Sequence, residues 1–292
     1  MSVRIERAAF EGSDSLGTSL SSSERAIRVY SAFIRNAFLN MLAYRLRYVT
    51  GILTYLLLVS VQYFIWQAVY AGRAGEASVN GYSLSQMITY VSIGWIARSF
   101  YHSNIDYEID ELVRSGQISI YLLRPVNFQL MLLAHAFGES LFRISCFSAP
   151  IAVVILVAFP VLPPDGVGPF GLFCLSTVLG FVVLAQVNFL TGLVAFSVKS
   201  IQGIMRAKYY LIQLFSGLLL PLPFFPAWAE SILSVLPFKA IAFIPLQFYL
   251  GKVPQDEVLA TLASQAAWIG ALWLLGLWGW SRAVDRLTLQ GG

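Results

Sequence analysis

Three titratable residues share the spacing that places side chains on one face of a helix. His135, Glu139 and Arg143 lie at positions i, i+4 and i+8, so they stack along a single helical stripe. An ion pair between Glu139 and Arg143 would offset part of the cost of burying either charge in an apolar region. Two interpretations stay open: a polar lining for a translocation path or proton relay, or a structural pair that anchors the foot of a helix.

A second polar stretch, residues 105–128, separates two strongly apolar regions. Its acids come first and its bases come late, which favours a short helix through the helix dipole. Gly116 suits the end of that helix. Pro125 disfavours helix at Arg124, so we expect the chain to turn there before a new helix starts. The stretch is either a solvated connection or a surface that another protein grips.

Catalytic motifs are missing from the sequence. It contains no phosphate-binding loop, no zinc-protease motif and no serine-hydrolase elbow,. The two histidines, His102 and His135, fall on different predicted helices, and the two cysteines, Cys146 and Cys174, lie in apolar runs. We interpret the acids of residues 106–111 as a solvated helix start. The sequence therefore indicates no enzyme, no metal site and no cofactor bound by this chain.

Composition indicates an integral membrane protein. The chain has 292 residues, of which 58% are hydrophobic and 12% are charged, whereas a soluble domain has about 25% charged residues. The net charge of +4 could suggest nucleic acid for a soluble protein. Here the bases flank apolar segments, where they set membrane topology, so we expect no nucleic-acid partner.

Apolar segments long enough to cross a hydrocarbon core of about 30 Å predict an all-α protein with six transmembrane helices. The predicted spans are residues 49–70, 84–100, 144–162, 170–198, 209–225 and 266–280. Two apolar pieces between the last two spans, residues 227–236 and 238–250, are too short to cross and are broken by prolines. We expect them to form external re-entrant or interfacial helices.

The N-terminal region divides into two parts ahead of the transmembrane domain of residues 49–292. Residues 1–23 are polar and serine-rich and are interpreted as a mobile cytoplasmic tail,. Residues 24–48 are expected to form a basic amphipathic helix, which predicts contact with a membrane surface or with a partner protein,. Lys and Arg gather before the first span, in the second and fourth connections and at the chain end. This distribution predicts that both termini and residues 105–128 are cytoplasmic.

Two segments carry a resemblance to a known family. The sequence YLLRPV at residues 121–126 follows Gly116, and PLPFFPAW at residues 221–228 precedes the last span. With the predicted topology, these segments resemble the membrane subunit of an ABC-2 type ABC transporter, and the resemblance covers nearly the whole chain after residue 24.

The resemblance implies a permease in the inner (plasma) membrane that works as a pair with an identical or homologous subunit. ATP and Mg²⁺ would be bound by separate ATPase subunits, which would dock on the second connection. The coupling residues would be Glu108, Glu111, Arg114, Tyr121, Leu122 and Arg124. A lipid-like, drug, peptide or glycan substrate would be exported. The alternative is an ion-coupled secondary transporter that uses Glu139 and Arg143.

Overall fold

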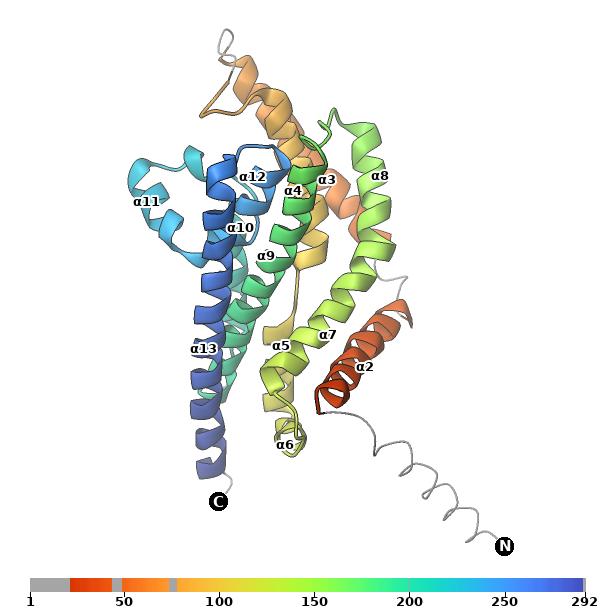
Figure 1. The fold of residues 1–292 in the computed structure, drawn as a ribbon, viewed down its shortest axis with the longest axis vertical. Helices are drawn as coiled ribbons and strands as arrows, with labels where there is room; N and C mark the ends of the chain where they lie inside the picture. The colour runs from red at the N-terminus through yellow and green to blue at the C-terminus, as the bar shows by residue number, and fades with distance from the viewer. Residues whose placement is uncertain (1–21, 44–48, 74–77, 199, 291–292) are drawn as a thin grey trace, which may run out of the picture.

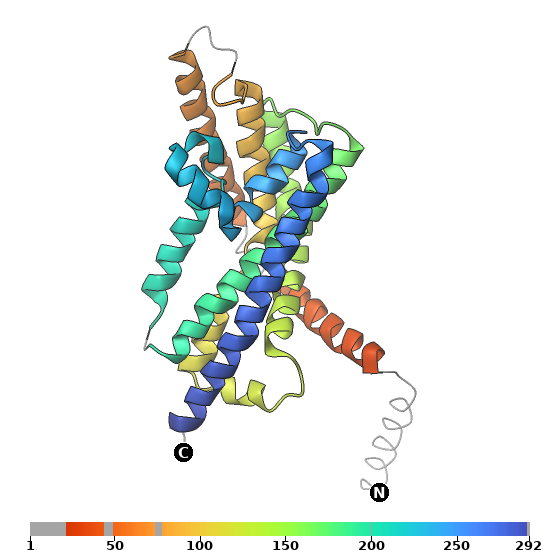
Figure 2. The ribbon, with the colours of Figure 1, turned by 60° about the vertical axis from the view of Figure 1, so that its left-hand side comes forward.

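The structure is a computed structural model that describes residues 22–43, 49–73, 78–198 and 200–290. Within these ranges the regular structure is helical apart from one β-bridge between Val79 and Tyr82. The helices form an elongated bundle (Figure 1, and turned by 60° in Figure 2). The short helix α6 (Ile118–Leu122) and the last turns of α13 (Val258–Gln290) lie at one end, here called the α6 end. Helix α12 (Phe243–Tyr249) lies toward the opposite end, here called the α12 end.

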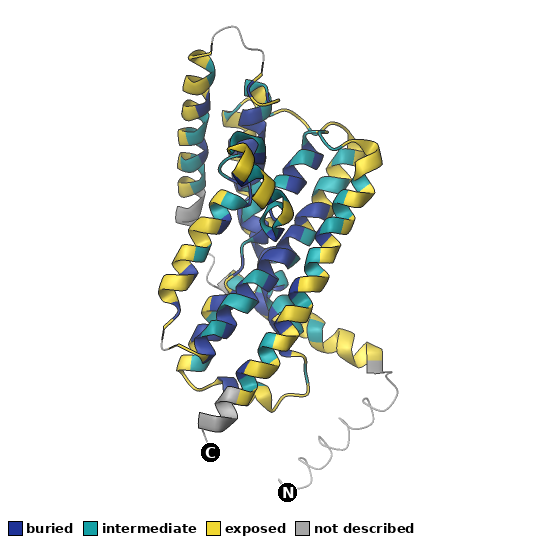
Figure 3. Cartoon of the chain, turned by 90° about the vertical axis from the view of Figure 1, so that its left-hand side faces the viewer, coloured by how far each residue is buried: buried dark blue, intermediate teal, exposed yellow. Residues whose placement is uncertain are grey.

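Four helical runs in the described part of the chain are long and apolar enough to cross a membrane. They are Leu53–Ala71 in α3 (Val49–Ala71), Phe128–Ala158, Val167–Phe196 and Gln255–Asp285. They correspond to the first, third, fourth and sixth predicted spans. The outer surfaces of these runs are largely exposed, as the burial colours in Figure 3 show, and many of the exposed side chains are apolar. An apolar exterior of this kind suits contact with lipid chains.

The second predicted span, residues 84–100, is a helix with nearly the expected bounds, but it is not one of these four runs. It forms α4 (Leu84–Tyr101), which begins with a capping box: Ser83 accepts from the Gln86 amide, and the Gln86 side chain accepts from the Ser83 amide. Most of α4 is buried. The other helices surround it, so its surface faces protein more than lipid.

The bounds predicted for the fifth span, residues 209–225, are wrong. Helix α10 (Gln202–Phe215) begins earlier and has only 14 residues. The chain then turns at Gly217, whose φ is +85°, a conformation that favours glycine. The Tyr90 hydroxyl donates to the Gly217 carbonyl at 2.6 Å and holds this turn. Pro221 and Pro223 cannot donate backbone hydrogen bonds, so the apolar run continues without continuing the helix.

The two short apolar pieces that follow are helical, as expected. The first forms α11 (Ala227–Val235), and the second forms a 3-10 turn (Pro237–Ala240) followed by α12. Both helices are too short to cross a bilayer. Their re-entrant or interfacial placement stays a prediction.

Helix α2 (Ser22–Ala43) is the described part of the predicted amphipathic helix, and it lies alongside α7 (Phe128–Arg143) (Figure 1). Residues 44–48, and residues 1–21 of the predicted tail, fall outside the described residues. The contact depends on Gly138, because a Cβ atom there would overlap the Ile34 carbonyl oxygen and lie 2.9 Å from the Ala37 Cβ. One face of α2 therefore binds this chain itself.

The helix that begins as α7 changes its winding before it continues as α8 (Ala149–Ala158). The segment between them, Ile144–Ser148, is a π-helix. Pro150 is the second residue after this segment, and its ring would clash with the carbonyl four residues earlier in a regular α-helix. The wide turn removes that conflict. The Ser148 hydroxyl is hydrogen-bonded to the Ser99 hydroxyl of α4, so the π-segment is fixed against a neighbouring helix.

Candidate functional site

The second connection folds as two short helices, of which the sequence predicts the first. Helix α5 (Ile105–Arg114) has Asp106 and Glu108 in its first turn and Arg114 in its last. The chain reverses at Gly116, whose φ is +73°, and α6 follows. Helix α7 then starts at its N-cap Asn127, whose side chain accepts from the Leu130 amide at 2.9 Å. The helix end at Gly116 and the break around Pro125 are both confirmed.

The interpretation of the α5 acids as solvated is wrong for two of them. Asp106 and Asp110 are 1% and 2% exposed, because the face of α5 that carries them packs into the bundle together with Ile109. Each carboxylate has a basic partner: Asp110 lies 3.0 Å from Arg114, and Asp106 lies 2.6 Å from the Lys208 ammonium. Only the opposite face, with Glu111, is exposed.

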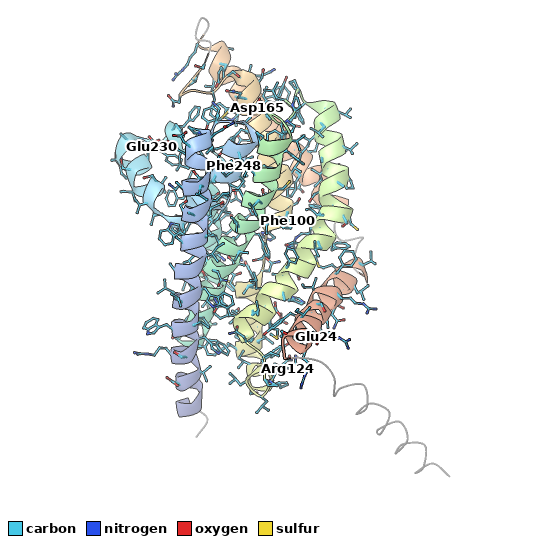
Figure 4. The ribbon with its side chains drawn as sticks, viewed as in Figure 1. Glu24, Phe100, Arg124, Asp165, Glu230 and Phe248 are labelled. Carbon is cyan, nitrogen blue, oxygen red and sulfur yellow. The ribbon has the colours of Figure 1, made fainter. Side chains whose placement is uncertain are left out.

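Helix α6 presents apolar side chains to the outside at the α6 end of the bundle. Ile120, Leu122 and Leu123, here called the α6 tip, are 53%, 37% and 86% exposed. The exposed charges of Glu111, Arg114 and Arg124 belong to the same connection, and Figure 4 places Arg124 at this end. An apolar centre with charges around it is the usual anatomy of a protein-binding surface.

Tyr121 has a different role from its neighbours in α6. Its ring is half-buried, lies edge-on to Phe128 with centroids 6.0 Å apart, and receives the Arg124 guanidinium at 4.6 Å. Phe128 is itself stacked on Trp280 of α13, with centroids 4.3 Å apart. Tyr121 therefore joins the α6 tip to α7 and α13, and it is less available to a partner than the sequence predicted.

The helical stripe of His135, Glu139 and Arg143 divides into two pairs. Glu139 and Arg143 form the predicted ion pair, with 3.3 Å between the nearest nitrogen and oxygen. His135 pairs instead with Glu108 of α5, at 3.5 Å. Arg143 also donates to the His102 carbonyl oxygen and to the Ser140 hydroxyl. Arg143 thus fixes α7 to the end of α4, which favours the structural interpretation of this residue.

A groove of about 370 Å³ lies between α5 and α7, and it brings the two predicted groups of residues together. Glu108 and Glu111 line it from α5, while His135 and Glu139 line it from α7. Among the residues that the structure describes, no group of three or more His, Cys, Asp or Glu side chains could hold a metal ion.

Sequence reasoning missed Lys208 and Asp106 as members of a buried polar network that joins three parts of the fold. Lys208 of α10 donates to the Asp106 carboxylate and to the Asn188 side-chain oxygen of α9 (Val167–Leu193). Asn188 in turn donates to the carbonyl and the hydroxyl of Ser103, at 2.9 and 2.8 Å. The only sequence signal was the polar Asn188 in an apolar span.

Other polar residues of the apolar helices also bond across helices. The Gln129 side chain of α7 donates to the Gln186 side chain of α9. The Gln265 side chain of α13 accepts from the Ser176 hydroxyl at 3.0 Å and donates to the Ala240 carbonyl at 2.8 Å. Such bonds satisfy polar groups where water is absent and fix the mutual rotation of the helices.

Comparison with protein families identifies the chain. A family model described as "ABC-2 family transporter protein" matches residues 56–291. The match includes the α5–α6 connection, the π-segment and all four long apolar runs, the first from residue 56 on. A search of curated proteins gave no match. Because the family model spans most of the sequence, the chain belongs to the ABC-2 family of transporter proteins.

Proposed function

We propose that this chain is the membrane-spanning permease subunit of an ATP-driven exporter, and that separate ATPase subunits bind the α6 tip. Family membership supports a transport role. The chain contains no phosphate-binding loop, so the energy of ATP has to come from other chains, which would bind ATP and Mg²⁺.

The observation that carries the proposal is the exposure of the α6 tip. Ile120 and Leu123 are more than half exposed on a connection between helices, away from the long apolar runs. Leaving such side chains in water is unfavourable by about 25 cal/mol for each Å² of apolar surface. A partner protein would bury them, while Glu111, Arg114 and Arg124 would set its register through charged contacts.

The contacts behind the tip give a route for movement into the bundle. The ring of Tyr121 touches Phe128, the first residue of α7, and Phe128 is stacked on Trp280 of α13. A displacement of α6 would therefore act on two long helices at once. Because aromatic rings in a packed interior have little room to yield, they transmit displacement well.

The remaining partners follow from the exposed surfaces and from the charge distribution. A second permease subunit would cover part of the exposed apolar exterior, and lipid would cover the rest. The distribution of Lys and Arg along the sequence supports a permease of the inner (plasma) membrane whose α6 end and termini would face the cytoplasm. A lipid-like, drug, peptide or glycan substrate suits such an exporter.

The test compares two leucines of matched exposure at opposite ends of the bundle. Leu123, in the α6 tip, is 86% exposed, and Leu259, in the first turn of α13, is 79% exposed. Leu123→Asp should reduce recovery of the cognate ATPase in a pull-down by at least about tenfold, since the charge would have to be desolvated at the contact. Leu259→Asp is the control and should bind as wild type does.

Two further results would decide against the proposal. Equal recovery of the ATPase with wild type and with Leu123→Asp would show that the α6 tip is not the docking surface. Transport by the purified chain in liposomes with a proton gradient and without ATP or ATPase would favour the ion-coupled alternative. Tyr121→Asp is a poor test, because it would also break the packing against Phe128.

A further inference from the structure

A small cavity lies among the C-terminal end of α4, α5, α9 and α10. Its volume is about 60 Å³, which leaves room for a small polar group. Side chains that can donate hydrogen bonds line its wall, among them Arg98, Tyr101, Lys208 and Tyr209, and the Asp106 carboxylate lines it as well. The apolar part of the wall includes Leu184, Ile212 and Leu218.

Within the described residues, the hydrogen-bond partners of the Arg98 side chain are all neutral. Its two terminal nitrogens donate to the Tyr55 hydroxyl at 3.1 Å and to the Tyr209 hydroxyl at 2.7 Å. Arg98 takes no part in the ion pairs that Asp106, Glu108, Asp110 and Glu139 form. A guanidinium has five N–H donors, so donors remain after these two bonds. Each tyrosine accepts from Arg98 and therefore keeps its own hydroxyl proton for another acceptor.

Tyr101 gives a second and independent sign of a missing acceptor. Its side chain is 5% exposed, and its hydroxyl has no hydrogen-bond partner among the described residues. A buried hydroxyl without a partner costs free energy. Because Tyr101 also lines the cavity, a ligand held there can supply the acceptor.

The balance of charge on the wall indicates the sign of that ligand. The Lys208 ammonium donates to the Asp106 carboxylate and to the Asn188 side chain. Asp106 is therefore already paired, and the Arg98 charge has no carboxylate partner in the described structure. A phosphate group matches this wall, because its oxygens accept from a guanidinium fork and from hydroxyls at the same time.

We propose that this cavity binds the phosphate group of an amphiphile, with Arg98, Tyr101 and Tyr209 as donors. The phosphate would belong to a bilayer phospholipid or to a phosphate-bearing molecule in solution. The position of Arg98, in the last turn of α4, suits the level at which headgroups lie. This inference goes beyond the proposed function, because binding needs no ATPase.

The test uses the full chain purified in a neutral detergent. Thermal unfolding is measured with added phosphatidylglycerol, with phosphatidylcholine of the same chains, and with inorganic phosphate. We expect wild type to be stabilised more strongly by phosphatidylglycerol than by phosphatidylcholine, whose choline cation opposes the Arg98 charge. Arg98→Gln should weaken the apparent affinity for phosphatidylglycerol at least about tenfold, since charge-assisted bonds are lost.

Two further variants keep the test decisive. Tyr101→Phe removes only the hydroxyl without a partner, so it should fold and should weaken phosphatidylglycerol binding several-fold even if Arg98→Gln does not fold. Arg282→Gln is the control, because Arg282 lies over the Trp278 ring of α13 and does not line the cavity. It should bind as wild type does.

The three additives separate the sources of the phosphate. Stabilisation by phosphatidylglycerol alone identifies a lipid as the ligand, whereas competition by inorganic phosphate shows that the phosphate group suffices; both support the site. Equal stabilisation of wild type by the two lipids, with no effect of inorganic phosphate, would overturn it. Wild-type affinity in Tyr101→Phe and in a folded Arg98→Gln would overturn it as well.

Discussion

The Lys208 ammonium lies 2.6 Å from the Asp106 carboxylate, and this contact joins α10 to α5 between positions 102 residues apart in the sequence. Helix α10 has few other anchors, since Met205 and Ile212 are its only buried residues. The ion pair therefore has a large share in holding α10 to the bundle.

The first prediction concerns this pair. Asp106→Asn and Lys208→Gln should each lower the free energy of unfolding by about 3 to 5 kcal/mol, because each leaves the other charge buried without its partner. The double variant should recover part of the loss. Chemical unfolding in detergent, arranged as a double-mutant cycle, measures the coupling. Losses that simply add would mean that the two side chains do not interact.

The second prediction separates Arg143 from its partner Glu139. The Arg143 side chain is 7% exposed and has three hydrogen-bond acceptors, whereas the Glu139 side chain is 20% exposed and has one partner, Arg143, within the described residues. Arg143→Gln should therefore destabilise the protein clearly more than Glu139→Gln does. The midpoint of chemical unfolding gives the comparison. An equal or reversed order would show that Arg143 does not anchor α7 to α4.

The third prediction tests the contact of α2 with α7. Gly138→Ala should destabilise the protein by about 1 to 3 kcal/mol, since the added methyl group overlaps the Ile34 carbonyl of α2 and forces the helices apart,. Gly270→Ala in α13 is the matched control, because a Cβ atom there meets nothing within 4 Å. That control should be neutral or slightly stabilising, as expected for alanine in a helix. Equal stability of the two variants would show that α2 and α7 do not lie in close contact at Gly138.

The fourth prediction concerns topology. Leu123 at the α6 end and Val167 at the α12 end are 86% and 90% exposed, so cysteines at both sites should react when they can be reached. With Cys146 and Cys174 replaced, an impermeant thiol reagent should label Val167→Cys and leave Leu123→Cys unlabelled in intact cells. Labelling of Leu123→Cys only after the membrane is opened confirms the orientation. Labelling of Leu123→Cys but not of Val167→Cys in intact cells would show the opposite orientation.

Much of the fold could be predicted because apolar runs and helix-ending residues are local signals. The start and end of α5, the turn at Gly116 and the short helices after Pro226 follow from residues that lie within a few positions of one another. The end of α10 could not be predicted in this way. The Gly217 turn is held by Tyr90, which is 127 positions away, and an apolar run gives no sign of such a contact.

The candidate site was predictable to a similar degree. The Glu139–Arg143 pair follows from helical spacing, and it is present. The burial of Asp106 was not predictable, because an acid in the first turn of a helix is usually solvated, and only the distant Lys208 makes its burial possible. Tyr121 and Leu122 are neighbours in sequence, yet only Leu122 is exposed, because the packing of α6 on Phe128 decides which side chain turns inward.

The π-segment Ile144–Ser148 bears on how chain length can vary in this protein. A π-turn closes its hydrogen bond over one residue more than an α-turn does, so the segment holds one residue that a regular helix would not need. Removing exposed Ser145 would leave α7 and α8 with their inward faces unchanged, while the turn around Pro150 would carry the strain. Removing one residue from α8 instead would rotate every later side chain of that helix by about 100°, and would turn buried Ile155 away from the bundle. The wide turn is thus the place where this long helix can be shortened without losing its register.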